Sequence, residues 1–262
     1  MGYGWRSRHR TATPTPSRSS PVAPPDAGRA GTPKSPRLPD ALTEISGSSA
    51  GDEGAIAESL LRGDFTDSWG EDHALERSRL VQAQLIGAAS SRLRALDVRI
   101  EGSDLSGSDF DESSFTRVVF HECRLSGAVF SRCSFRDVLF SGCRLNQANF
   151  AMSETSSVMF EDTDLRESDF YAANLGGTRF FDCNLSGAQF SKATTIGVRF
   201  HGSTLTDLKG GQALAGAVIE SSQVLPVALA VLSDLGIGVD DERDAPVPAD
   251  SKGRGGRGSS AG

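Results

Sequence analysis

Every fifth residue between positions 105 and 205 is large and apolar. Each of these positions holds Phe or Leu, with Thr155 and Thr195 as the two exceptions. Twelve of the fourteen Phe in the chain lie at these positions between 105 and 205. The residue two places before each of them is always small, being Ser, Ala, Val, Cys or Thr. This self-similarity is an internal repeat, and it limits the possible folds more strongly than composition does.

A period of five fits neither a helix, which repeats every 3.6 residues, nor a strand, which repeats every two. It requires a backbone that turns a corner every five residues, with one small and one large side chain pointing inward. Four such sides close a coil of twenty residues, and the sequence shows this longer period as well. Columns twenty residues apart hold like residues: Phe at 120, 140, 160, 180 and 200; Leu at 105, 125, 145, 165, 185 and 205; Phe at 110, 130, 150, 170 and 190.

These residues resemble the pentapeptide-repeat family, whose pattern is A(D/N)LXX with Leu or Phe at the centre. The pattern is carried by Ala148-Asn149-Phe150, Ser168-Asp169-Phe170, Ala173-Asn174-Leu175 and Ser103-Asp104-Leu105. The resemblance implies an all-β solenoid, a right-handed quadrilateral β-helix. The same fold serves many roles, so the repeat alone does not indicate a function.

The repeat and the composition divide the chain into five parts. A faint five-residue phase begins at Leu75, so we expect the β-helix to span 75–220. Before it we expect an irregular N-terminal cap at 56–74 and a disordered, Pro/Ser/Arg-rich tail at 1–55. After it, a helix-start signal and an apolar spacing of three and four predict a C-terminal α-helix within 221–237. The polar, Gly-rich residues 238–262 are expected to be disordered.

The charge and hydropathy of the chain bear on its location and partners. The net charge is −7, no apolar run is long enough to span a membrane, and no apolar segment follows the N-terminus. We therefore expect a cytoplasmic protein without membrane contact. The first forty residues are basic, which fits direct contact of this tail with nucleic acid or with an acidic partner, or alternatively a solvated linker or an over-extended start site.

Candidate catalytic and metal-binding residues do not form a site. Cys123, Cys143 and Cys183 fall on one inward column and Cys133 on another, so reduced core thiols are expected. His121 and His201 lie four coils apart, roughly 19 Å at the parallel-strand spacing. The carboxylates between Glu161 and Asp169 are spread over three sides of the coil. We expect no catalytic residues, no metal and no cofactor, and hence a protein that is not an enzyme.

An apolar stripe occurs at outward positions on the side of Phe120. It consists of Val119, Leu139, Met159 and Phe181, where other sides carry mostly polar residues. A contiguous apolar patch often marks an interaction site. We therefore interpret the stripe as a face for a partner protein. The alternative is that the chain's own N-terminal segment covers it, with Phe65 and Trp69 as candidates.

The predicted C-terminal helix has one apolar face, which also allows two interpretations. Either it pairs with its copy in a homodimer, or it only caps the last coil, whose edge would otherwise be exposed. The dimer is favoured by resemblance to the gyrase-interacting, fluoroquinolone-resistance members of the family, in which a C-terminal helix forms the dimer. The face consists of Val224, Leu225, Ala228, Leu229, Leu232 and Leu235.

Two functions follow. A solenoid has rigid, repetitive sides that suit docking of another macromolecule, so the first is a scaffold that binds a protein of unknown identity. The second is implied by the resemblance: a DNA mimic that binds DNA gyrase and modulates it or protects it from quinolones. A mimic requires a long run of one sign, and the outward positions carry only about −5 over roughly 26 Å of coil height. The sequence therefore favours the general scaffold.

Overall fold

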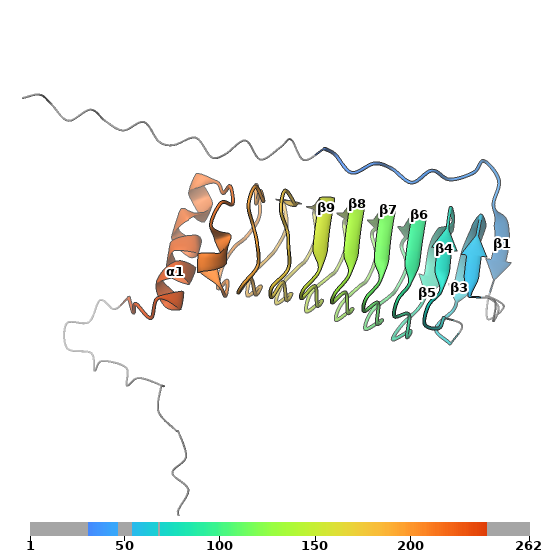
Figure 1. The fold of residues 1–262 in the computed structure, drawn as a ribbon, viewed down its shortest axis with the longest axis horizontal. Helices are drawn as coiled ribbons and strands as arrows, with labels where there is room; N and C mark the ends of the chain where they lie inside the picture. The colour runs from blue at the N-terminus through green and yellow to red at the C-terminus, as the bar shows by residue number, and fades with distance from the viewer. Residues whose placement is uncertain (1–30, 47–53, 68, 240–262) are drawn as a thin grey trace, which may run out of the picture.

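The computed structural model describes residues 31–46, 54–67 and 69–239. They form a column of parallel strands stacked along one axis, which is a β-helix (Figure 1). The sheet order is β1-β3-β5-β6-β7-β8-β9-β10, and β4 pairs with both β2 and β6. The strands are β1 (Thr43–Ser46), β2 (Ala55–Ala57), β3 (Ser59–Asp64), β4 (Ala74–Glu76), β5 (Arg79–Gln84), β6 (Arg94–Glu101), β7 (Ser114–His121), β8 (Ser134–Ser141), β9 (Glu154–Glu161) and β10 (Arg179–Phe181).

The register between coils confirms the twenty-residue period. Phe120 pairs with Phe140, and Phe140 with Phe160, while single bridges such as Asp104 to Arg124 continue the ladder on the other sides. The Phe columns stack face to face, with centroids 4.7 Å apart for Phe120 and Phe140 and 5.1 Å apart for Phe130 and Phe150. These distances match the spacing of parallel strands, so the interior is a set of continuous aromatic and aliphatic stacks.

The corners explain how a five-residue unit can turn. At many corners the backbone N–H of the third residue after the central Phe or Leu donates to the carbonyl of that central residue, as Ala128 does to Leu125 at 3.1 Å. The second residue after the centre has a positive φ, even where it is not glycine, as at Glu112 (56°) and Arg132 (53°). A left-handed residue costs roughly 1–2 kcal/mol, so the ladder of backbone hydrogen bonds between coils must offset this cost at every such corner.

The two polar centres of the repeat are satisfied by hydrogen bonds. The hydroxyls of Thr155 and Thr178 lie 2.7 Å apart. The hydroxyl of Thr195 donates to the carbonyl of Ala213 at 2.7 Å. Buried hydroxyls without partners are costly, so these contacts explain why the Phe/Leu rule can be broken at two places.

The N-terminal boundary predicted from the sequence is wrong. The ladder starts at β1, and residues 56–74, expected to be an irregular cap, contain β2, β3 and the start of β4. Ile56, Leu61, Phe65 and Trp69 are buried inside the column. The phase is hidden because Leu61 pairs with Leu80, nineteen residues on, and a bulge interrupts β3 between Leu61 and Gly63.

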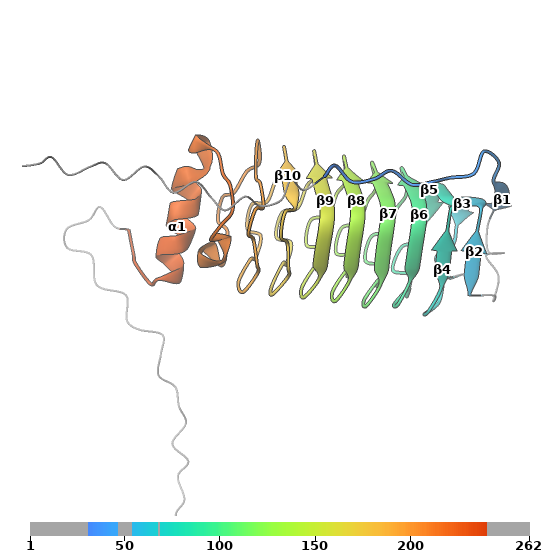
Figure 2. The same ribbon diagram turned by 45° about the horizontal axis from the view of Figure 1, so that its top comes forward.

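Residues 31–42, expected to belong to a disordered tail, run along the outside of the column from the level of β9 to β1 (Figures 1 and 2). We call this segment the strap. The rest of the predicted N-terminal tail, apart from 43–46 and 54–55, lies outside the described residues. The predicted C-terminal tail is described only for residues 238 and 239.

At the other end, the chain closes the column with helices. A 3-10 turn, η1 (Gly211–Leu214), is followed by η2 (Ser221–Gln223) and α1 (Val224–Asp234). The buried side-chain amide of Gln223 donates to the carbonyl of Ser203 at 2.6 Å, and Ala230 of α1 is buried against the core cluster. In the described residues, no helix is long and apolar enough to cross a membrane.

Candidate protein-binding surface

Three residues of the predicted apolar stripe are neighbours in register. Val119 of β7 pairs with Leu139 of β8, which pairs with Met159 of β9. Arg99 precedes them in the same column and Arg179 follows them. The fourth residue, Phe181, lies in the column of Glu161, and its ring contacts His201 at 6.2 Å. The stripe is therefore a three-residue apolar column with Phe181 beside its end.

The stripe is less exposed than its outward positions predict. Val119 is only 8 % exposed although it does not belong to the core cluster, and Leu139 and Met159 are half-buried. Phe65 and Trp69, which the sequence suggested as the cover, lie inside the column instead. The segment that crosses this side is the strap, whose contacts on β6 and β8 lie two residues before the stripe column.

The strap is held by buried carboxylates at the turn between two sides of the coil. The backbone N–H of Arg37 donates to Asp97 Oδ1 at 2.9 Å, and that of Lys34 donates to Asp137 Oδ1 at 3.3 Å. The Arg179 guanidinium donates to the carbonyl of Gly31. These contacts join residues more than fifty positions apart, so they fix the strap on one side of the column.

Arginines set the ionisation of the carboxylates on this side. Arg117 forms a fork with Asp97, with N–O distances of 2.6 and 2.7 Å, and holds the pKa of that carboxyl below its ordinary value. Burial opposes ionisation of Glu101, but Arg99 and Arg79 bind its two oxygens, and its pKa is lowered as well. The rim of the stripe is thus charged but internally paired.

Opposite charges stack at twenty-residue intervals through the N-terminal half of the column. Asp72 binds Arg92, Asp97 binds Arg117 and Glu112 binds Arg132, with N–O distances of 2.8, 2.6 and 3.2 Å. Each pair joins adjacent coils, because a residue lies directly beside the residue twenty positions later. These ladders interrupt the acidic surface that a mimic of duplex DNA would need.

The predicted face of the C-terminal helix points mostly away from the column. Val224, Leu225, Leu229 and Leu235 are 56, 68, 45 and 58 % exposed. Ala228 is exposed too, while Leu232 is half-buried. The helix caps the last coil through a different face, which contains Ala230. Capping and pairing are therefore compatible, because they use different sides of α1.

The cysteines that the sequence offered as candidates for catalysis are buried, and one carboxylate of the acidic stretch is paired with an arginine. All four cysteines are free and buried, and burial raises the pKa of Cys133 and Cys183 to about 12. Within the described residues, no group of three His, Cys, Asp or Glu side chains could hold a metal ion. Asp164, in the densest acidic stretch, is bound by Arg166 at 2.6 Å.

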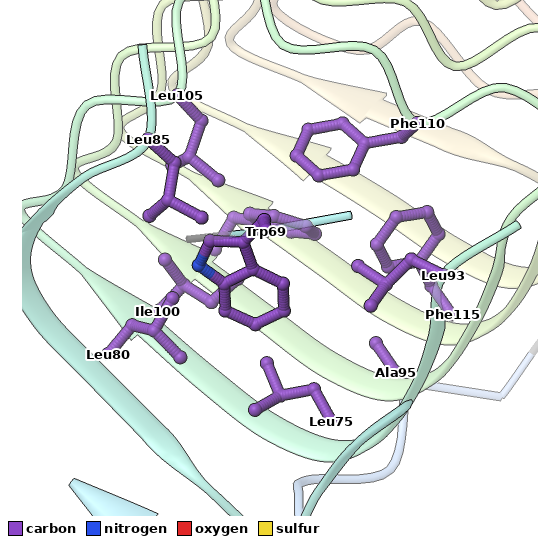
Figure 3. Close-up of a pocket in the computed structure, with 11 residues that line it drawn as sticks. Trp69, Leu75, Leu80, Leu85, Leu93, Ala95, Ile100, Leu105, Phe110 and Phe115 are labelled. Carbon is purple, nitrogen blue, oxygen red and sulfur yellow. The ribbon is translucent and has the colours of Figure 1, made fainter. Parts of the chain in front are cut away.

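A small apolar cavity lies in the interior of the column. It lies near the N-terminal end of the core, with Trp69 across it and Leu75, Leu80 and Ile100 around it (Figure 3). Its volume of about 10 Å³ is at the lower limit for a single water molecule, and its lining side chains are apolar. This cavity is therefore too small to bind a ligand.

One feature of this surface could have been recognised in the sequence. Pro33, Pro36 and Pro39 recur every three residues, which is the period of a polyproline-II helix. The position of these prolines on the column could not be predicted from the sequence, because the contact that places them, from Lys34 to Asp137, joins residues 103 positions apart.

Comparisons with known proteins agree with this geometry. The model of the pentapeptide repeat region matches residues 94–170 and 113–190, and that of the pentapeptide repeats (8 copies) matches 183–209. No curated protein sequence matches the chain.

Solved structures with the same repeat are similar to the chain. Full-length QnrB1, a plasmid-mediated fluoroquinolone resistance protein, is 22 % identical, with a TM-score of 0.35 over 75 % of this chain and 97 % of its own. HetL from the cyanobacterium Nostoc sp. strain PCC 7120, involved in heterocyst differentiation regulation, is 19 % identical, with a TM-score of 0.33 over 64 % and 90 %. The repeat, the stacked columns and the family models together identify residues 94–209 as a pentapeptide-repeat region.

Proposed function

We propose that this protein is a non-enzymatic scaffold that binds another protein through the side formed by β6 to β10. The observation that carries the proposal is the apolar column of Val119, Leu139 and Met159, which lies in register across three coils with Arg99 and Arg179 at its ends. An apolar centre with a charged rim is typical of protein interfaces. Phe181 extends this face toward His201.

The rigidity of the column supports the same function. Its core is filled by stacked side chains, and each coil is bonded to the next on every side, so the outer surface has a fixed shape. Binding to a preformed surface avoids the entropic cost of ordering it. Four buried, free thiols suit a reducing compartment, and we place the scaffold in the cytoplasm on that ground.

We further propose that two copies pair through α1. Leu225 and Leu229 are exposed apolar side chains one helical turn apart, and Val224 and Leu235 extend the same surface. Two-fold pairing would bury this face against its own copy. A full-length variant with Leu225→Asp and Leu229→Asp should be monomeric by light scattering while its circular dichroism is unchanged. An unchanged mass in that variant would exclude pairing through this face.

Binding to DNA gyrase remains the alternative for the partner. QnrB1 is a fluoroquinolone resistance protein with a similar fold, but the Asp–Arg ladders of this chain break the acidic surface that a DNA mimic requires. Gyrase is therefore included in the binding experiment as one named partner rather than as the leading hypothesis.

The experiment compares capture of host proteins by the parent, by a stripe variant and by a matched control. The stripe variant carries Leu139→Asp and Met159→Asp. The control carries Met152→Asp and Ile196→Asp, which alter exposed apolar residues on other sides. Captured proteins are quantified by mass spectrometry, with gyrase measured directly. We expect capture to fall at least tenfold in the stripe variant and to persist in the control. Equal capture by all three proteins would refute the proposed face.

A further inference from the structure

The contacts of the strap follow a regular spacing. Gly31, Lys34 and Arg37 are three residues apart, and they bind Arg179, Asp137 and Asp97, which lie about two coils apart. Three residues of polyproline-II helix span about 9.3 Å. Two coils span about 9.6 Å at the parallel-strand spacing. One turn of an extended proline-rich strand therefore matches two coils, and the match repeats along the column.

The prolines have the same period and face the column. Pro33, Pro36 and Pro39 are half-buried, whereas Lys34 and Arg37, which follow the first two, are exposed. The residue after a proline is the one whose N–H reaches a carboxylate. The strap thus presents rings to the column on one side and basic side chains to water on the other.

The column supplies matching groups at the turn before the stripe. Asp97, Arg117 and Asp137 occupy one column in adjacent coils, all with left-handed backbone conformations. Arg117 binds Asp97, whose Oδ1 also accepts the N–H of Arg37. Among the described residues, both the hydrogen bond and the ion pair found at Asp137 come from Lys34. Arg117 of the adjacent coil interacts with Asp137 only through its charge, so the strap supplies the direct contacts of this buried carboxylate.

We propose that the surface at Asp97, Arg117 and Asp137, which we call the strap site, binds extended, basic, proline-rich peptide segments, and that the strap is its built-in occupant. The recognised pattern is a proline followed by a basic residue, repeated every three positions. The strap site adjoins the stripe, so the inference deepens the proposed scaffold function by naming the chemistry of the partner segment. A tethered occupant has a high effective concentration, so a partner segment must compete with the strap.

The test uses a fluorescein-labelled peptide of residues 31–41 and fluorescence anisotropy. It is titrated into the parent and into a full-length strap variant. In this variant the strap is altered so that it no longer binds, while the strap site itself is unchanged. We expect the strap variant to bind the peptide at least tenfold more tightly than the parent, and not to bind a peptide with all three prolines replaced by alanine. The strap variant carries Pro33→Ser, Lys34→Glu, Pro36→Ser and Arg37→Glu.

A matched pair of substitutions tests the strap site itself. Asp137→Gly removes the carboxylate without strain, since Gly177 holds the same corner position two coils later with a φ of 74°. Asp182→Gly makes the same change at an exposed corner in another column, where Gly202 follows. In the strap variant, Asp137→Gly should weaken peptide binding at least tenfold and Asp182→Gly should leave it unchanged.

Tryptic cleavage at Arg37–Leu38 gives a readout without added peptide. In the otherwise unaltered chain, Asp137→Gly should speed this cleavage relative to Asp182→Gly, because the strap loses a contact. Equal cleavage rates, or no saturable peptide binding up to about 1 mM, would overturn the inference. Loss of partner capture in the stripe variant without any peptide binding would overturn it too, yet leave the scaffold function standing. Peptide binding without partner capture would support the peptide-binding inference and refute the scaffold function.

Discussion

Replacing Phe140 by alanine tests the stacked core most directly. The ring is fully buried between Phe120 and Phe160, with centroid distances of 4.7 and 4.8 Å and interplanar angles of 5° and 3°. Phe130, Phe135 and Phe150 meet it edge to face at 6.3, 6.1 and 6.2 Å. The substitution therefore removes two stacked and three edge-to-face ring contacts at once.

The loss of unfolding free energy depends on whether the neighbouring rings can move to fill the cavity. Phe→Ala in a core costs about 3–5 kcal/mol, and the cost is larger when the site cannot collapse. Here the rings above and below are fixed by strand pairing on either side, Phe120 to Phe140 and Phe140 to Phe160. The coils cannot close the gap without breaking that ladder, so we expect a loss of unfolding free energy near the upper end, about 4–5 kcal/mol.

The control is Phe181→Ala, one residue out of phase. Phe181 is half-buried and has one aromatic contact, with His201 at 6.2 Å. Its loss should cost about 1 kcal/mol, the scale of one exposed aromatic pair. Equilibrium guanidinium melts of full-length proteins, followed by circular dichroism, measure both. Equal destabilisation would refute the assignment of inward and outward positions.

Three other results are expected. The four cysteines should react with a thiol reagent far more slowly in native buffer at pH 8 than after unfolding, since they are buried; rapid native labelling would contradict their placement. Gly211→Ala should destabilise the C-terminal cap, because an added Cβ would lie 2.6 Å from the backbone nitrogen of Val231, and exchange of α1 amides should quicken while that of β7 does not. Asp97 has a pKa lowered by Arg117, so its contribution to stability is present above its ordinary pKa and is lost as pH falls through the folded value; the melting temperature should drop below about pH 4, and less steeply in Asp97→Asn.

The central coils could be predicted from the sequence because their repeat is local and unbroken. Each five-residue unit carries its own inward pair, so the phase alone identifies residues such as Phe130 and Leu145 as buried. The N-terminal coils also place apolar side chains inward, but the number of residues per coil differs from twenty. Ile45 pairs with Leu61 sixteen residues on, and Leu61 with Leu80 nineteen residues on. A bulge or a shorter corner changes the count without changing the core, and a fixed-period analysis loses such coils.

The surface was harder to predict, for a physical reason. An outward position is exposed only if nothing else in the chain covers it, and the cover here comes from a segment with few apolar residues of its own. The strap binds through two backbone N–H groups and three prolines, which a search for hydrophobic residues does not detect. The apolar residues of the helix face, such as Leu225 and Leu229, could be predicted from the sequence. That this face points away from the column could not, because Ala230 and Gln223 provide the contact with the last coil instead.

The distribution of charge along the column connects oligomeric state with partner choice. Arg144 and Asp164 continue the ladders of opposite charge beyond Arg132. In another column, Asp162 and Asp182 are exposed neighbours of like sign. This acidic pair lies in the half of the column that carries α1. Two copies joined through α1 would bring the acidic pairs of both chains to the central part of the dimer and lengthen the run of one sign. A monomer offers no such run, so the light-scattering mass of the parent also decides whether a DNA-like partner surface can form.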